Sequence, residues 1–106
     1  MPRCGKSTAK PASYRLSHRA KADLEAIWLH SEDVWSLRQA EKYVSGLYDM
    51  FQQLAEMPGI GRKVTISGRD YQRFDHVSHT IFFRVQSPGI LIVRILHQRM
   101  GSERHV

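Results

Sequence analysis

Residues 80–97 read TIFFRVQSPGILIVRILH and contain two apolar, β-forming segments on either side of a short turn. Thr80–Gln86 and Ile90–His97 are rich in Ile, Phe, Val and Leu, and Ser87-Pro88-Gly89 joins them, which is the pattern of a β-hairpin. The unbroken apolar run Ile90–Val93 predicts a strand that is buried on both faces. The hairpin therefore provides the centre of a sheet, to which the rest of the chain must attach.

Two amphipathic helices are predicted upstream of this hairpin. In the first, apolar side chains recur every three or four residues, at Ala20, Leu24, Ile27 and Trp28. This spacing predicts a helix over His18–His30, with Ser17 as its N-cap. A longer apolar stripe, which includes Tyr43 and is expected to face the core, predicts a second helix over Leu37–Met57. Pro58-Gly59 ends this helix because proline cannot continue the hydrogen-bond ladder. Ser31–Trp35 is expected to be either the frayed end of the first helix or a corner between the two helices.

The remaining segments complete an α+β pattern. Tyr14–Leu16 alternates as a short strand does, and Tyr71–Val77 is a further strand. The glycine-rich stretch between the second helix and Tyr71 predicts a loop, with Val64–Ile66 as a candidate extended segment. The order strand, two helices, three strands predicts an antiparallel sheet packed against an N-terminal helical hairpin. Residues 1–12 are expected to be a flexible basic tail, and residues 13–106 a single domain.

Charge is distributed unevenly along the chain. The 106 residues carry a formal net charge of +6, with a pI near 9.9. Residues 18–57 hold four Lys or Arg against seven Asp or Glu, whereas residues 58–106 hold eight against three. An acidic half is thus followed by a basic half, which suits either an acidic protein partner or a polynucleotide.

Composition excludes several classes of protein. One cysteine, Cys4, allows no intramolecular disulfide and no thiolate cluster for zinc. No apolar run reaches the roughly 20 residues of a membrane span, and the N-terminus lacks the apolar stretch of a secretory signal. We therefore expect a cytoplasmic protein without membrane contact, metal or cofactor.

Basic and histidine side chains gather at the C-terminal end of the chain. They are Arg94, His97, Arg99, Arg104 and His105. Such a cluster is typical of a cationic recognition surface or of an RNA-cleaving site, in which arginine stabilises phosphate charge and histidine moves a proton. It is equally typical of a solvated edge that discourages aggregation. His76 and His79 lack further ligands at metal-binding spacing, so His79, at a strand turn, is interpreted as a hydrogen-bonding residue.

Several segments, taken in order and spacing, resemble the ParE toxins of the RelE/ParE superfamily. The opening segments are Tyr14-Arg15-Leu16-Ser17 and residues 20–27 (AKADLEAI), and they are followed by residues 39–43 (QAEKY) and 54–62 (LAEMPGIGR). The ending matches best: residues 79–85 (HTIFFRV) and 92–100 (IVRILHQRM) are similar to the family's last two strands. The similarity covers residues 13–106.

The resemblance implies the toxin of a bacterial type II toxin–antitoxin pair. ParE-like members inhibit DNA gyrase, and so DNA replication, without being known as catalysts. A cognate ParD-like antitoxin, a ribbon-helix-helix protein with an acidic tail, neutralises them in a hetero-oligomer. On this basis the residues expected to contact the target are Arg94, His97, Arg99 and Arg104. Those expected to contact the antitoxin are Trp28, Trp35 and Arg84.

Two alternatives remain open at the level of the sequence. RelE-like members are ribosome-dependent mRNA endoribonucleases, and Arg73, Arg84 and Arg99 fall near their basic positions. This chain ends Arg104-His105-Val106 and lacks the terminal tyrosine that is common in those nucleases, so in this alternative His97 or His105 would take its place. The second alternative is an interaction module that has lost toxicity and persists because it binds its antitoxin.

Overall fold

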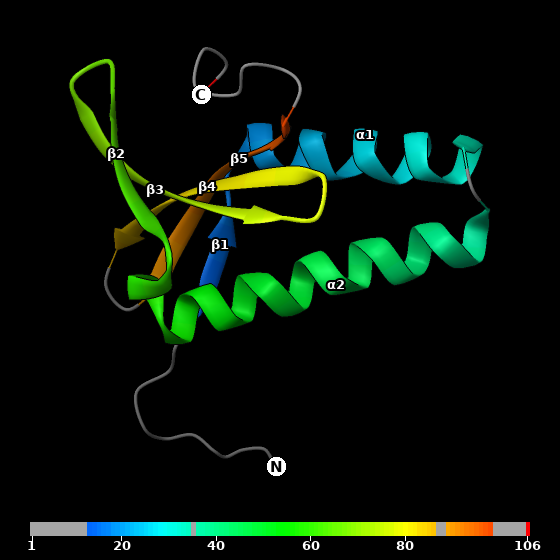
Figure 1. Ribbon diagram of the computed structural model, residues 1–106, viewed down its shortest axis with the longest axis horizontal. Helices are drawn as coiled ribbons and strands as arrows, with labels where there is room; N and C mark the ends of the chain where they lie inside the picture. Colours follow the sequence, from blue (N-terminus) through cyan, green and yellow to red (C-terminus); the bar gives the residue numbers. More distant parts are fainter. Residues whose placement is uncertain (1–12, 35, 87–88, 99–105) are drawn as a thin grey trace.

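The computed structural model describes residues 13–34, 36–86, 89–98 and 106, in which two helices pack on one face of a five-stranded sheet (Figure 1). In chain order the elements are β1 (Tyr14–Leu16), α1 (His18–Val34), α2 (Leu37–Glu56), the 3-10 helix η1 (Pro58–Ile60), β2 (Arg62–Ile66), β3 (Arg69–His76), β4 (His79–Gln86) and β5 (Gly89–His97). The strands lie in the order β1-β5-β4-β3-β2. The predicted α+β class, with a helical hairpin against a sheet, is confirmed.

The sheet is mixed, so the prediction of a wholly antiparallel sheet was wrong at one edge. β1 pairs with β5 in parallel, with Tyr14 opposite Ile90, whereas the other strand pairs are antiparallel. Gly89 permits this pairing: the backbone N–H of Ile90 donates to the carbonyl oxygen of Ser13 at 3.0 Å, and a Cβ at residue 89 would lie 1.8 Å from that oxygen. The parallel pair depends on a close approach between distant segments, which local sequence patterns do not encode.

A further strand occupies the stretch that was predicted as a loop. β2 begins at Arg62 and not at Val64, and β3 begins at Arg69 and not at Tyr71. The two strands form a hairpin closed by Ser67 and Gly68, which have φ values of 52° and 78°. Two consecutive residues with positive φ match the right-handed twist of a two-stranded ribbon.

The helix boundaries follow the predicted caps. The Ser17 hydroxyl accepts a hydrogen bond from the backbone N–H of Ala20 at 3.0 Å and donates one to the carbonyl of Val93 at 2.8 Å. It therefore caps α1, as predicted, and also ties the start of that helix to β5. The helix α1 continues past its predicted end to Val34, and α2 stops just before Pro58. Among the described residues, no helix is long and apolar enough to cross a membrane.

The hydrophobic core lies between the helices and one face of the sheet. Its fully buried members include Leu47 and Phe51 of α2 and Ile81 and Ile92 of the sheet. The prediction that Ile90–Val93 is buried on both faces was wrong, because Ile90 and Ile92 are buried but Leu91 and Val93 are only partly so. The strand buried on both faces is the central one, β4, where residues 80–83 are all 0% exposed.

Candidate functional site

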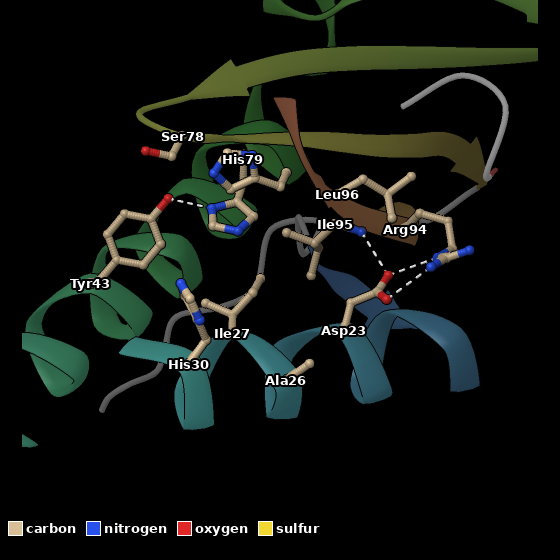
Figure 2. A pocket seen from close by; sticks show the side chains of 11 residues that line it. Asp23, Ala26, Ile27, His30, Tyr43, Ser78, His79, Arg94, Ile95 and Leu96 are labelled. Carbon is tan, nitrogen blue, oxygen red and sulfur yellow. Dashed lines mark hydrogen bonds and ion pairs between the residues drawn. The ribbon is translucent and has the colours of Figure 1, made fainter. Parts of the chain in front are cut away.

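A pocket of about 400 Å³ opens between the helical layer and the sheet, at the end of the sheet that carries the β3–β4 turn (Figure 2). Two of the predicted target-binding residues, Arg94 and His97, line it. The other lining residues are Asp23, Ala26, Ile27, His30, Tyr43, Ser78, His79, Ile95 and Leu96. Side chains from α1, α2, β4 and β5 thus surround the pocket, and its lining includes both polar and apolar side chains.

One wall of the pocket is a buried ion pair. The Arg94 guanidinium donates to the Asp23 carboxylate from Nε to Oδ2 at 2.7 Å and from Nη2 to Oδ1 at 3.0 Å. The backbone N–H of Ile95 donates to the same Oδ2 at 3.0 Å. Both charged side chains are nearly buried, at 13% and 14% exposure. The Asp23 carboxylate therefore accepts from the backbone of β5 beyond the residues that pair with the short strand β1. It also holds the Arg94 side chain against α1.

Tyr43 and His79 form the opposite wall. The Tyr43 hydroxyl lies 2.6 Å from Nδ1 of His79. Burial, together with the neighbouring His97, lowers the pKa of His79 to about 4, so the ring is neutral near pH 7. Burial raises the pKa of Tyr43, although a backbone hydrogen bond from Ser78 opposes the shift. The hydroxyl is therefore protonated, and we assign it as the donor to Nδ1 and as the acceptor from the Ser78 N–H. The interpretation of His79 as a hydrogen-bonding residue at a strand turn is confirmed.

Three histidines lie in register across adjacent strands. His76 of β3 is opposite His79 of β4, which is opposite His97 of β5. The rings of His79 and His97 meet edge to face, with centroids 5.2 Å apart. Burial lowers the pKa of His76 as well. Within the described residues, no group of three or more His, Cys, Asp or Glu side chains is arranged to hold a metal ion.

The chemistry available to His79 is limited by its partner. A general base needs a free lone pair, and Nδ1 of His79 already accepts from Tyr43. A histidine acts as a general acid in its imidazolium form, and a ring with a pKa of about 4 is not in that form near neutral pH. The pair is suited to fixing α2 against the β3–β4 turn.

That turn is strained and is held from both sides. Val77 adopts φ 52°, which is uncommon for a β-branched residue, and its side chain is 73% exposed. On one side Tyr43 bonds to His79; on the other, Gln98 donates from its backbone N–H to the carbonyl of Ser78 at 3.0 Å and from Nε2 to the carbonyl of Val77 at 3.1 Å. Sequence patterns placed Tyr43 in the core stripe of α2 and did not identify this role.

The predicted antitoxin-binding residues do not share one surface. Trp28 is partly buried on α1 and lines a groove of about 340 Å³ between α1, α2 and β1, together with Leu16, Lys21, Leu24, Glu25, Val44 and Tyr48. Arg84 lies on β4, with its guanidinium 5.8 Å from the centroid of the Tyr71 ring. Trp35, Arg99 and Arg104 lie outside the described residues.

Comparison with known proteins gives a consistent result. Residues 14–101 match the family model described as the ParE toxin of the type II toxin–antitoxin system parDE. A curated protein named Toxin ParE1 from Caulobacter vibrioides is 41% identical over 93 residues, which are 88% of this chain and 96% of the relative. A Toxin ParE1 from Mycobacterium tuberculosis is 39% identical over 94 residues, again 88% and 96% of the two chains. A solved chain from a chromosomal ParDE system of P. aeruginosa has the same fold, with a TM-score of 0.70 at 24% identity over 84% of this chain and 98% of that one.

Proposed function

The chain belongs to the ParE toxins of type II toxin–antitoxin systems, and from this membership we propose that it inhibits DNA gyrase until a ParD-like antitoxin neutralises it. The observation that carries the proposal is the family match over residues 14–101. In this proposal the toxin acts in the bacterial cytoplasm, by binding and not by catalysis. The state of His79 is consistent with a non-catalytic mode, because its Nδ1 lone pair is engaged by Tyr43 and its ring is not in the imidazolium form near neutral pH.

A supercoiling assay tests the target. Purified toxin added to gyrase should reduce supercoiling and accumulate cleaved DNA complexes. Absence of both effects at micromolar toxin would refute gyrase as the target. Mapping transcript ends after brief induction separates the RelE-like alternative, since a ribonuclease gives codon-positioned cuts, whereas a gyrase inhibitor gives an SOS response with intact messages.

The target-binding surface is proposed to be the C-terminal basic segment with His97. His97 lines the pocket, and Arg99 and Arg104 follow β5 in the sequence. Replacing Arg99 and Arg104 together with glutamine should reduce gyrase inhibition about tenfold or more, because each removes a charge that can pair with an acidic or DNA-bound surface. Unchanged inhibition by a folded double variant would remove these residues from the surface.

The antitoxin is proposed to bind the groove beside Trp28 and to extend around the sheet towards Arg84. A groove lined by Leu16, Leu24, Val44 and Tyr48 fits the apolar side of a segment that folds on binding. Acidic residues on that segment would complement Arg84. The toxin and antitoxin then form a hetero-oligomer.

Trp28 is the residue whose removal tests this groove. Tryptophan anchors at interfaces typically contribute 2 kcal/mol or more, so Trp28→Ala should weaken antitoxin binding by about thirtyfold. Leu29→Ala is the matched control, because Leu29 is 56% exposed on the same helix and does not line the groove. Equal affinities for the Trp28→Ala variant and the parent would exclude Trp28 as an anchor.

A further inference from the structure

Arginine side chains are concentrated on the face of the sheet that the helices do not cover. Arg62 of β2 lies directly opposite Arg73 of β3, and Arg73 lies opposite Phe82 of β4. Phe82 is buried yet is not part of the core between helices and sheet, which places this row on the outer face. Arg84, two residues along β4, shares that face. We call Arg62, Arg73 and Arg84 the arginine face.

Two arginines of this face, Arg73 and Arg84, lie within cation–π distance of aromatic rings. The Arg73 guanidinium lies 5.5 Å from the centroid of the Phe82 ring, and that of Arg84 lies 5.8 Å from the Tyr71 centroid. The attraction between a guanidinium cation and the face of an aromatic ring helps to hold these two arginines in place on the sheet. This arrangement also restricts the arginine rotamers before any ligand binds.

Asp75 is an acidic residue that contacts the arginine face. Asp75 forms an ion pair with Arg73 at 3.2 Å and accepts a hydrogen bond from Thr80 at 2.8 Å. That hydrogen bond is the main cause that lowers the pKa of Asp75, and Arg73 and Arg62 lower it further. Asp75 thus offsets Arg73, whose side chain is only 17% exposed, and the exposed cation of this cross-strand pair is Arg62.

The β2–β3 hairpin carries this charge away from the helices. Figure 1 shows its turn extending beyond both helical elements. Arg62, Lys63 and Arg69 are all exposed on it. Beside it is a groove of about 470 Å³, lined by Lys63, Val64, Thr65, Asp70, Tyr71, Gln72, Arg84 and Val85. A two-stranded ribbon fits the major groove of B-DNA, which is about 12 Å wide, whereas the major groove of duplex RNA is too deep and narrow.

We propose that the β2–β3 ribbon and the arginine face form a DNA-binding surface, which contacts the phosphate backbone of duplex DNA. The contacts are electrostatic, with phosphates placed along the cations of β2, β3 and β4. The surface lies on a different part of the molecule from the Trp28 groove. The proposal does not depend on gyrase, because it concerns binding of the toxin alone to DNA.

Fluorescence anisotropy with a short labelled duplex tests the surface. The ribbon variant is Arg62→Gln with Arg69→Gln, and the control is Arg38→Gln with Lys42→Gln on α2. All four side chains are exposed, so both double variants remove two charges without opening the core. At about 50 mM salt the ribbon variant should bind about tenfold more weakly, and the slope of log K against log salt should become less negative by about 1.8. The control should bind as the parent does.

Three results would overturn the proposal. They are no binding by the parent protein at tens of micromolar, equal losses in the ribbon and control variants, and tighter binding to duplex RNA than to duplex DNA. Gyrase inhibition by the parent is measured separately. A parent that binds DNA but leaves gyrase active refutes the proposed target and not this surface.

Discussion

The ion pair between Asp23 and Arg94 predicts how the C-terminal strand is held against the helices. Asp23→Asn keeps the size of the side chain but removes the charge that receives two hydrogen bonds from Arg94 and one from the Ile95 backbone. The substitution leaves a nearly buried guanidinium without its counter-charge. It should therefore lower the free energy of unfolding without changing the exposed side chains of the protein.

The size of the effect follows from burial. Removing one partner of a fully buried pair costs about 3–5 kcal/mol. The two side chains are 13% and 14% exposed, and an asparagine oxygen still accepts one hydrogen bond. We therefore expect a loss of about 2–3 kcal/mol in the free energy of unfolding, out of about 5–15 kcal/mol for a domain. The thermal midpoint should fall by about 10–15 °C.

Denaturant unfolding of four proteins measures this interaction: the parent, Asp23→Asn, Arg94→Met and the double variant. If Asp23 and Arg94 are coupled, the two single variants together should lose about 2 kcal/mol more unfolding free energy than the double variant loses. Glu25→Gln, which alters an exposed carboxylate on the same helix, should change stability by less than about 0.5 kcal/mol. A loss below that value for Asp23→Asn, or simple additivity, would refute the structural role of the pair.

The same cycle bears on toxicity. Arg94 is among the residues proposed to contact the target, yet its guanidinium is engaged with α1. If Arg94 acts through stability, Arg94→Met should recover toxicity at a growth temperature at which it is folded. If Arg94 contacts the target, the folded variant should remain inactive.

Three further predictions follow from the site and the fold. The pKa of His79 is about 4 in the folded protein and about 6.5 in the unfolded chain, so between these pH values the unfolded chain binds more protons. The contribution of the neutral His79 to the free energy of unfolding is therefore complete above about pH 7 and is lost as the pH is lowered. Because His79 is partly exposed, the free energy of unfolding should fall by about 1 kcal/mol between about pH 7 and pH 5. Denaturant titrations should show a smaller pH-dependent fall in His79→Gln and the full fall in the exposed control His18→Gln. Tyr43→Phe should cost about 1–2 kcal/mol and raise hydrogen exchange at the β3–β4 turn, whereas unchanged exchange would contradict its clamping role. Gly89→Ala should detach β1 and lower the thermal midpoint steeply, because the added Cβ would clash with the carbonyl oxygen of Ser13. Gly59→Ala is the control, because its added Cβ meets nothing within 4 Å. Equal melting curves for the two variants would contradict the close approach between residue 89 and Ser13.

Sequence patterns predicted the elements whose signals are local. The helices follow from apolar spacing and from caps such as Ser17, and β4 and β5 follow from their apolar runs. β2 was predicted only in part, as the candidate extended segment Val64–Ile66, because Arg62-Lys63-Val64-Thr65-Ile66 is short, begins with two charges and follows a glycine. The parallel direction of β1 was missed because it is set by pairing with β5, at the other end of the chain.

Sequence patterns identified some of the residues that line the pocket but not the contacts between them. Arg94 and His97 were identified from the basic C-terminal pattern, and both line the pocket. Asp23 was not singled out, since one carboxylate on an acidic helix carries no local signal, and its partner Arg94 lies 71 residues away. Tyr43 was hidden for the opposite reason: an aromatic residue in an apolar stripe is expected in the core, yet its hydroxyl reaches His79 at the rim.

The division of charge along the sequence becomes a division between layers in the fold. The acidic segment forms α1 and α2, and most of the basic segment forms the strands β2 to β5. In a two-layer structure, helices that cover one face of the sheet leave the other to the basic strands. The proposed antitoxin groove beside Trp28 then lies on the helical side of this chain, and the proposed cationic surface lies on the far side of the sheet. If both proposed surfaces are correct, occupancy of the Trp28 groove alone should leave DNA binding by the ribbon intact, and only an antitoxin that also reaches Arg84 should abolish it.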